Sequence, residues 1–295
     1  MNKHAIFWAV FLILFSAACA SAEEFQLIYK DGEVSARSRT GWSTLMNGDS
    51  VPADSQIKLA PGAIAEFSSP GATLLFSKPG TYRLQAAAEQ KPPQAATMLS
   101  SVFSRIARMS GDDDREQSQA MGVRGSEAAD NAGLTWIDED SMSFDEAKSA
   151  YLAGNYTQAI DTLENQVDPI ILSDESEYWY YLAASYLAAG RKGPALRIAR
   201  QHPANQFSEV YSDFLLLKGR LQIEAMDYPA AADQLQQYIY SVSSDGRKQI
   251  GYYLYGIALQ QQGQTAHARR ALQTAVELDA DRELTELADD VLNKL

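Results

Sequence analysis

The sequence offers few side chains that could do chemistry, and the first candidate is a serine in a short turn. Gly48-Asp49-Ser50 has the residue types of a hydrolase motif in which a serine is the nucleophile. Such a serine needs a general base, and the only histidines after residue 22 are His202 and His267, within predicted helical repeats. We therefore interpret this triplet as a turn and expect no catalytic residues and no enzymatic activity.

Metal and thiol chemistry are also poorly represented. Residues 112–114 are three consecutive aspartates, but they lack the alternating ligands and the glycine of a calcium loop. The single cysteine, Cys19, lies in the N-terminal segment, so a chain cleaved after Ala22 has no disulfide bond. We expect no metal site and no cofactor.

The first residues are typical of an export signal. A short basic start precedes an apolar run, Ala5 to Phe15, that is too short to cross a bilayer, and Ala20-Ser21-Ala22 fits a cleavage site. We expect residues 1–22 to be a signal peptide and the mature chain to be exported and periplasmic. Lipid anchoring through Cys19 and secretion are the alternatives.

The net charge excludes some partners. The formal charge is −13, and it becomes −14 when Lys3 leaves with the signal peptide. Such a chain repels nucleic acid and anionic lipid, and no later apolar stretch has the length of a membrane helix. We expect no nucleic-acid partner and no transmembrane segment in the mature chain. The acidity either keeps an exported protein soluble or forms an acidic recognition surface.

Residues 23–86 have the pattern of short β-strands. Ala60-Pro61-Gly62, Ser69-Pro70-Gly71 and Lys78-Pro79-Gly80 are turn signals nine residues apart, which favours a small sandwich or β-roll. Lys30-Asp31-Gly32 predicts a hairpin after the first strand. The predicted strands are Phe25–Tyr29, Glu33–Arg37, Ser55–Leu59, Ala63–Phe67, Thr73–Phe76 and Thr81–Leu84.

Part of this pattern resembles an FecR-type domain. The matching residues are Gly32-Glu33-Val34, Gly41-Trp42, Leu45, Gly48-Asp49, Ile57, Ala65-Glu66-Phe67, Leu75, residues 80–84 (GTYRL) and residues 121–127 (MGVRGSE). The resemblance covers about a quarter of the chain and implies an extracytoplasmic β module. It is interrupted by about 35 residues rich in Ala, Pro, Gln and Ser. We expect no cytoplasmic anti-sigma segment, so sigma-factor signalling is not implied.

Residues 87–141 have the composition of a linker, with extended and acidic stretches and the GVRGS segment. Within it, Leu99, Val102, Phe103 and Ile106 recur at helical spacing, with two arginines beside them. This short amphipathic helix either docks on a partner or membrane surface, or covers the sheet or the first repeat. We favour the intramolecular alternative, because the segment is short and carries little basic charge.

Residues 142–295 repeat one helical pattern four times. Gly154, Gly190, Met226 and Gly263 occupy the same turn position and lie 36, 36 and 37 residues apart. A period of this length indicates stacked helix pairs, none of which buries its apolar face alone. The segment from Arg282 to Lys294 predicts a capping helix over the last repeat.

These repeats resemble tetratricopeptide (TPR) repeats over about half the chain. The clearest one places Trp179, Leu182, Ala183, Tyr186, Gly190 and Ala195 at the spacings of that signature. The resemblance implies an α-solenoid of about four helix pairs in which the first helix of each pair lines a concave groove. Carried over residue by residue, the partner-binding positions are Phe144, Lys148, Tyr151, Tyr180, Ala184, Leu187, Leu216, Arg220, Ile223, Tyr253, Ile257 and Gln260.

The expected fold is α+β and multidomain, with a small all-β FecR-like domain followed by the solenoid. Lys148 and Arg220 in an aromatic groove would suit a peptide that bears a carboxylate, although the aromatic residues could equally be ordinary core. We expect a non-enzymatic exported scaffold or adaptor for a protein or peptide partner in the cell envelope, with the β module engaging another envelope component. The alternative is a carbohydrate- or peptidoglycan-associated module in which Trp42 stacks on sugars.

Overall fold

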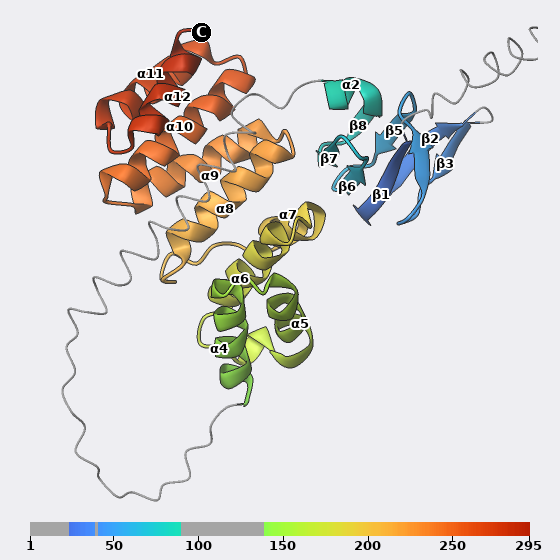
Figure 1. Ribbon diagram of the computed structural model, residues 1–295, viewed down its shortest axis with the longest axis horizontal. Coiled ribbons are helices and arrows are strands. Elements are labelled where there is room, and N and C mark those ends of the chain that lie inside the picture. The colour runs from blue at the N-terminus through green and yellow to red at the C-terminus, as the bar shows by residue number, and fades with distance from the viewer. Residues whose placement is uncertain (1–23, 39–40, 90–138) are drawn as a thin grey trace, which may run out of the picture.

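The computed structural model describes residues 24–38, 41–89 and 139–295, with side chains of the last range from residue 142 (Figure 1). Two antiparallel β-sheets, the β part, precede an array of helices, the helical part. The expected α+β layout is therefore present. The predicted signal peptide, the predicted amphipathic helix, residues 112–114 and the GVRGS segment lie outside the described residues.

The β part consists of two four-stranded sheets. One has the order β4-β1-β6-β7, formed by Ser50–Pro52, Glu24–Asp31, Ile64–Ser68 and Thr73–Phe76. The other has the order β3-β2-β5-β8, formed by Gly41–Thr44, Val34–Ser38, Gln56–Leu59 and Gly80–Arg83. Buried side chains of both sheets form one hydrophobic cluster that includes Phe25, Phe67 and Ile57. All six predicted strands are present, and β3 and β4 are additional.

The predicted hairpin at Lys30-Asp31-Gly32 is wrong. Strand β1 pairs with β4 and β6, whereas β2 pairs with β3 and β5, so this turn carries the chain from one sheet to the other. Gly32 has φ 81°, and a Cβ atom there would lie 3.0 Å from Ala63. The glycine signal therefore identified a tight turn correctly, but a turn signal does not specify which strand the next one pairs with.

Helix α2 (Leu84–Glu89) follows β8 without a break, and its Leu84 side chain is fully buried in the β cluster. The predicted domain boundary at residue 86 thus falls inside a helix that packs against the strands. The β part extends at least to Glu89, the last residue described before residue 139.

Four helix pairs and a closing helix form the helical part (Figure 1). The pairs are α4 (Glu139–Leu152) with α5 (Tyr156–Gln166), α6 (Glu175–Ala188) with α7 (Lys192–Gln201), α8 (Tyr211–Glu224) with α9 (Tyr228–Ser241), and α10 (Asp245–Gln261) with α11 (Thr265–Leu278). Helix α12 (Arg282–Leu292) packs against α10 and α11, and a short 3₁₀ turn, η1 (Pro169–Ile171), precedes α6. The first helices of successive pairs also contact one another.

The turn inside each pair has the left-handed backbone that the repeat alignment predicts. Gly154, Gly190 and Gly263 have φ angles of 81°, 78° and 74°. Glycine adopts this conformation without a steric penalty. Small residues inside the helices serve packing instead: a Cβ atom on Gly219 would lie 2.7 Å from Leu235. The periodic glycines therefore have two separate physical causes.

Met226 occupies the same turn position with φ 55°, although a non-glycine residue is strained there. Its side chain contacts the hydrophobic cluster of the β part. The third turn thus carries a side chain where the other three carry none, because this turn lies against the β part.

We expect Met226→Gly to be more stable than Met226→Ala, against the usual order of these two residues. Both variants lose the methionine contacts, but alanine keeps the left-handed strain of about 1–2 kcal/mol and glycine does not. Urea unfolding midpoints of the three chains would test this. An alanine variant as stable as the glycine variant would contradict the assigned strain.

The β part packs on the helical part through β1, β6 and β7, beside α7 and the α8–α9 turn (Figure 1). A Cβ atom on Gly193 would lie 2.3 Å from the Tyr29 ring, so only glycine fits there. Ser77 Oγ donates to the carbonyl of Ala225 at 3.3 Å. Arg200 donates to the Ser77 carbonyl at 3.1 Å. We call this contact the docking interface. The sequence predicted a linker between the β part and the helical part but did not predict that the two parts contact each other.

Candidate functional site

The Gly48-Asp49-Ser50 triplet forms a turn. Gly48 has φ 96°, and Asp49 Oδ2 accepts the backbone N–H of Met46 at 2.8 Å. His202, one of the two candidate bases, stacks on the Trp179 ring with 3.5 Å between centroids, and burial lowers its pKa. The aspartate thus closes the turn, and the histidine is part of a stacked aromatic pair in the helical part.

No group of three or more potential metal-ligating side chains gathers within the described ranges. None of the helices in that part of the chain is both long and apolar enough to span a bilayer.

Four predicted site residues lie together on the first two pairs. Phe144 and Tyr151 of α4 face Tyr181 of α6, with ring centroids 6.2 and 5.5 Å from the Tyr181 ring in edge-on contacts. Tyr180 contacts Tyr181 at 5.1 Å and Phe214 of α8 at 6.2 Å. Lys148 Nζ lies 5.4 Å from the centroids of both Phe144 and Tyr181. We call Phe144, Lys148, Tyr151, Tyr180 and Tyr181 the tyrosine cluster.

The tyrosine cluster is only partly accessible. Phe144 is buried at 7 % exposure, whereas the three tyrosines and Lys148 are half-buried. Burial raises the pKa of Tyr180 well above its ordinary value. Burial also raises the pKa of Tyr151, opposed in part by Arg220 and by a hydrogen bond with Tyr180. The phenols therefore stay neutral and serve as hydrogen-bonding, aromatic surface.

The cations around the tyrosine cluster are paired with carboxylates. Lys148 Nζ lies 2.5 Å from Glu177, and Arg220 Nε lies 3.1 Å from Glu224. Arg247 of α10 pairs with Asp213 of α8 and donates to Ser212 Oγ at 2.9 Å. An aromatic surface whose charges are neutralised internally can bind apolar and aromatic groups without a large electrostatic contribution.

Besides Phe144, six of the predicted partner-binding positions lie in the core, five large side chains and Ala184. Leu187, Leu216, Ile223, Tyr253 and Ile257 are at most 8 % exposed, and Ala184 is also buried. Four of the five belong to one cluster formed by the third and fourth pairs, because first helices of these pairs pack on each other as well as on their second helices. These side chains therefore offer no surface to a partner. Gln260 and Arg220 are half-buried.

The sequence reasoning missed Tyr181, Glu177, Asp213 and Arg247. A periodic signal existed for the two carboxylates, because Glu177 and Asp213 lie 36 residues apart, which is the repeat length. Each of them binds a cation from a neighbouring first helix. Comparing charges at equivalent repeat positions would have identified both pairs.

Trp42, the candidate sugar-stacking residue, lies on edge strand β3 and is 44 % exposed. The ammonium of Lys58 lies 6.0 Å from the centre of its ring. A sugar would compete with this lysine for the ring face, since both bind the electron-rich face of an indole.

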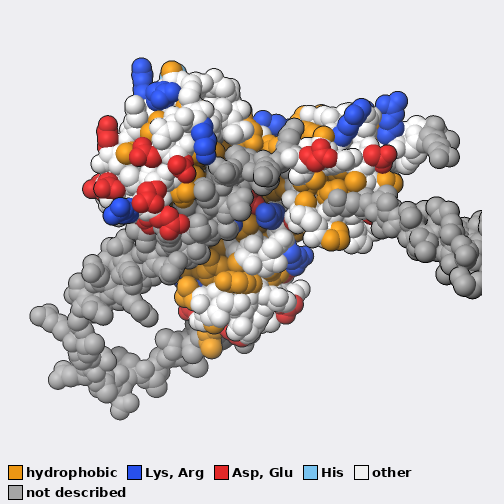
Figure 2. Space-filling model, turned by 45° about the horizontal axis from the view of Figure 1, so that its top comes forward, with side chains coloured by type: hydrophobic (Ala, Val, Ile, Leu, Met, Phe, Trp, Pro, Cys, Tyr) orange, Lys and Arg blue, Asp and Glu red, His pale blue; other side chains and the backbone are white. Residues whose placement is uncertain are grey.

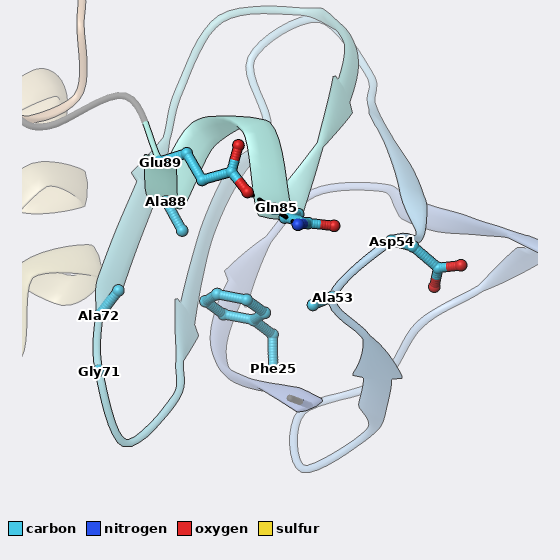
Figure 3. Close-up of a pocket in the computed structure, with 8 residues that line it drawn as sticks. All are labelled: Phe25, Ala53, Asp54, Gly71, Ala72, Gln85, Ala88 and Glu89. Atoms are coloured by element: carbon cyan, nitrogen blue, oxygen red, sulfur yellow. Dashed lines mark hydrogen bonds between the residues drawn. The ribbon is translucent and has the colours of Figure 1, made fainter. Parts of the chain in front are cut away.

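The β part also contains an open pocket of about 560 Å³ beside α2 (Figure 3). Its walls are Phe25, Ala53, Asp54, Gly71, Ala72, Gln85, Ala88 and Glu89. The polar side chains are two carboxylates and an amide, and Gln85 Nε2 already donates to Glu89 at 2.7 Å. The size suits a small molecule, but the pocket presents few directed polar groups compared with typical ligand sites.

The acidic charge is unevenly distributed over the surface. Figure 2 shows acidic side chains gathered over the C-terminal helices, at the left of the view, and hydrophobic side chains on the β part, at the right. The tyrosine cluster, with its internally paired charges, is therefore chemically distinct from the acidic end of the array.

Comparison of the chain with protein-family models and with curated proteins gives no match.

Proposed function

We propose that this chain is an exported, non-enzymatic scaffold protein of the TPR type, with a FecR-like β module, whose tyrosine cluster binds a peptide segment of an envelope protein. The TPR assignment is supported by four left-handed turn positions at intervals of 36, 36 and 37 residues. The FecR-like assignment is supported by a small two-sheet β part at the residues that carry that resemblance. The proposal of export to the periplasm is supported by the N-terminal sequence alone.

The observation that carries the binding function is the tyrosine cluster itself. Half-buried tyrosines from two adjacent first helices present rings and hydroxyls side by side. Tyrosine is enriched at protein interfaces because it combines a large apolar ring with a polar end and loses little rotamer entropy.

The charge pairs change the expected chemistry of the partner. The sequence favoured a peptide with a carboxylate, bound by Lys148 and Arg220. Each of these cations already has a carboxylate partner within the chain, so a second carboxylate would have to displace it. We therefore propose an apolar or aromatic segment of low charge as the ligand.

Peptides selected from a random library on the immobilised chain should be rich in aromatic and aliphatic residues. Tyr151→Ala and Tyr180→Ala should each weaken binding of such a peptide by about tenfold or more, because truncating a central interface tyrosine commonly costs ~2 kcal/mol. Fluorescence anisotropy with a labelled peptide measures this, and unfolding midpoints verify that the variants are folded.

Tyr240→Ala is the matched control, because Tyr240 is 82 % exposed on α9 and takes no part in the tyrosine cluster. It should leave the affinity unchanged. Affinity should also change little when the salt concentration rises, since no net charge is neutralised. Selected peptides that are acidic, or that bind both tyrosine variants as tightly as the unmodified chain, would refute the assigned site.

A further inference from the structure

A carboxylate in the docking interface makes an unusual set of contacts. Glu66 of β6 is 1 % exposed, and its two oxygens accept the backbone N–H groups of Lys192 and Gly193 at 3.3 and 2.8 Å. These are the first two residues of α7, and the N-cap residue Arg191 makes no side-chain cap. Glu66 thus caps this helix from a strand that lies more than a hundred residues earlier in the chain.

The charges around Glu66 do not neutralise it directly. Among the residues that the structure describes, no ion pair includes Glu66, and Lys192 Nζ instead lies 2.5 Å from Glu224. Tyr29 of β1 also faces Glu66, and Tyr29 itself interacts with Asp31 and with Arg197 of α7, which bonds Tyr29. Two amide dipoles therefore carry most of the direct stabilisation of the buried anion.

The desolvation of Glu66 has a larger effect on its pKa than the two amide dipoles have. Loss of solvent raises the pKa of Glu66, and the bonds from Gly193 and Lys192 and the charge of Lys192 only partly offset this, while Glu224 adds to the rise. Glu224 behaves oppositely: although burial opposes its ionisation, Lys192 and Arg220 together hold its pKa below the ordinary value. Lys192, Arg220 and Glu224 all belong to the helical part, so their pairing does not require docking.

We propose that the β part is a reversibly docked module whose attachment to α7 is strengthened when Glu66 takes up a proton. In the undocked chain Glu66 lies on an exposed sheet face and titrates as an ordinary glutamate. In the docked chain the same group binds its proton more tightly, so proton uptake favours the docked state. Docking therefore tightens as the pH falls from above the raised pKa towards the ordinary glutamate range.

The docking interface combines apolar and polar contacts. Ile64 of β6 and Leu75 of β7 belong to one buried hydrophobic cluster with side chains of α6, α7 and α8. Besides Glu66 the interface holds single hydrogen bonds from Ser77 to Ala225 and from Arg200 to Ser77, and a long ion pair of 3.7 Å between Lys78 and Asp227. Interfaces between domains of one chain commonly permit relative motion, and a buried carboxylate without an ion pair makes this contact weaker than its apolar part alone would be.

Opening of the interface can be measured with a thiol at Ser77, whose side chain is 3 % exposed and bonds across the interface. The chain carries Cys19→Ser and Ser77→Cys, and a pyridyl disulfide reagent labels the thiol between pH 7.5 and 5.5. Rates are divided by those of an unfolded peptide with the same cysteine, which removes the intrinsic pH dependence of the thiol. The normalised rate should fall as the pH is lowered through the raised pKa of Glu66.

Glu66→Gln keeps the acceptor oxygen but removes the buried charge. In this variant the normalised rate should be pH-independent over the same range, and at pH 7.5 it should be slower than in the glutamate chain. Adding Gly193→Val, which opens the interface sterically, should give fast labelling that no longer depends on residue 66. An equal pH trend in both chains, faster labelling at low pH, or slow labelling with Gly193→Val would overturn the proposal.

Discussion

Replacing Gly193 by valine is expected to unseat the β part and to lower the free energy of unfolding by about 1–3 kcal/mol, the usual cost of overpacking a close contact. Even the first carbon of a side chain at this position would lie 2.3 Å from the Tyr29 ring, and two further ring atoms lie at 2.8 and 3.0 Å. Denaturant unfolding measures the loss, and labelling of a cysteine at Ser77 shows that it arises at the docking interface.

The helix itself cannot account for such a loss. Valine is a better helix former than glycine by a few tenths of a kcal/mol, so the substitution alone favours α7. Tyr29→Ala removes the obstructing ring, and the double variant Tyr29→Ala/Gly193→Val should be destabilised by less than the sum of the two single variants. Additive losses would show that the two residues are not in contact.

Phe214→Ala is expected to cost about 3–5 kcal/mol, because the removed ring is completely buried and leaves a cavity between the second and third pairs. The ring packs in the cluster of the second pair and lies 4.9 Å from the ammonium of Lys218. Neighbour contacts hold such an array together, so a weakened contact should also separate the unfolding of the two halves. Urea unfolding followed by circular dichroism reports both effects.

Phe207→Ala provides the same chemical change on the surface. Phe207 lies between α7 and α8 and is 86 % exposed, so its removal should change stability by less than about 0.5 kcal/mol. A similar loss from both phenylalanine variants would contradict the assignment of Phe214 to the contact between the pairs.

The sequence determined the elements whose signals are local. Strand β6 and the turns at Gly154, Gly190 and Gly263 follow from residue types within a few positions of each other. The 36-residue period also predicted that the pairs stack, because each pair leaves an apolar face uncovered. Local signals also predict the turn at Gly32, but they do not predict to which sheet the next strand belongs.

At the candidate site the sequence was partly sufficient. It selected Phe144, Lys148, Tyr151 and Tyr180, which lie together, because one repeat position on a first helix predicts the others. It also selected Leu216 and Tyr253, which are core, because neighbouring helices cover the same repeat position in the third and fourth pairs. Burial depends on what the adjacent pair places opposite a residue, and the repeat pattern does not encode that.

Only the tertiary structure decided where the β part lies. The hydrogen bond between Glu66 and Gly193 joins residues 127 positions apart. The third turn carries Met226 where the other turns carry glycine, because a sheet distant in the sequence contacts this turn. Close approach over such a separation arises when two finished surfaces fit each other. The shape of a surface is a property of the assembled elements, so no run of neighbouring residues contains it.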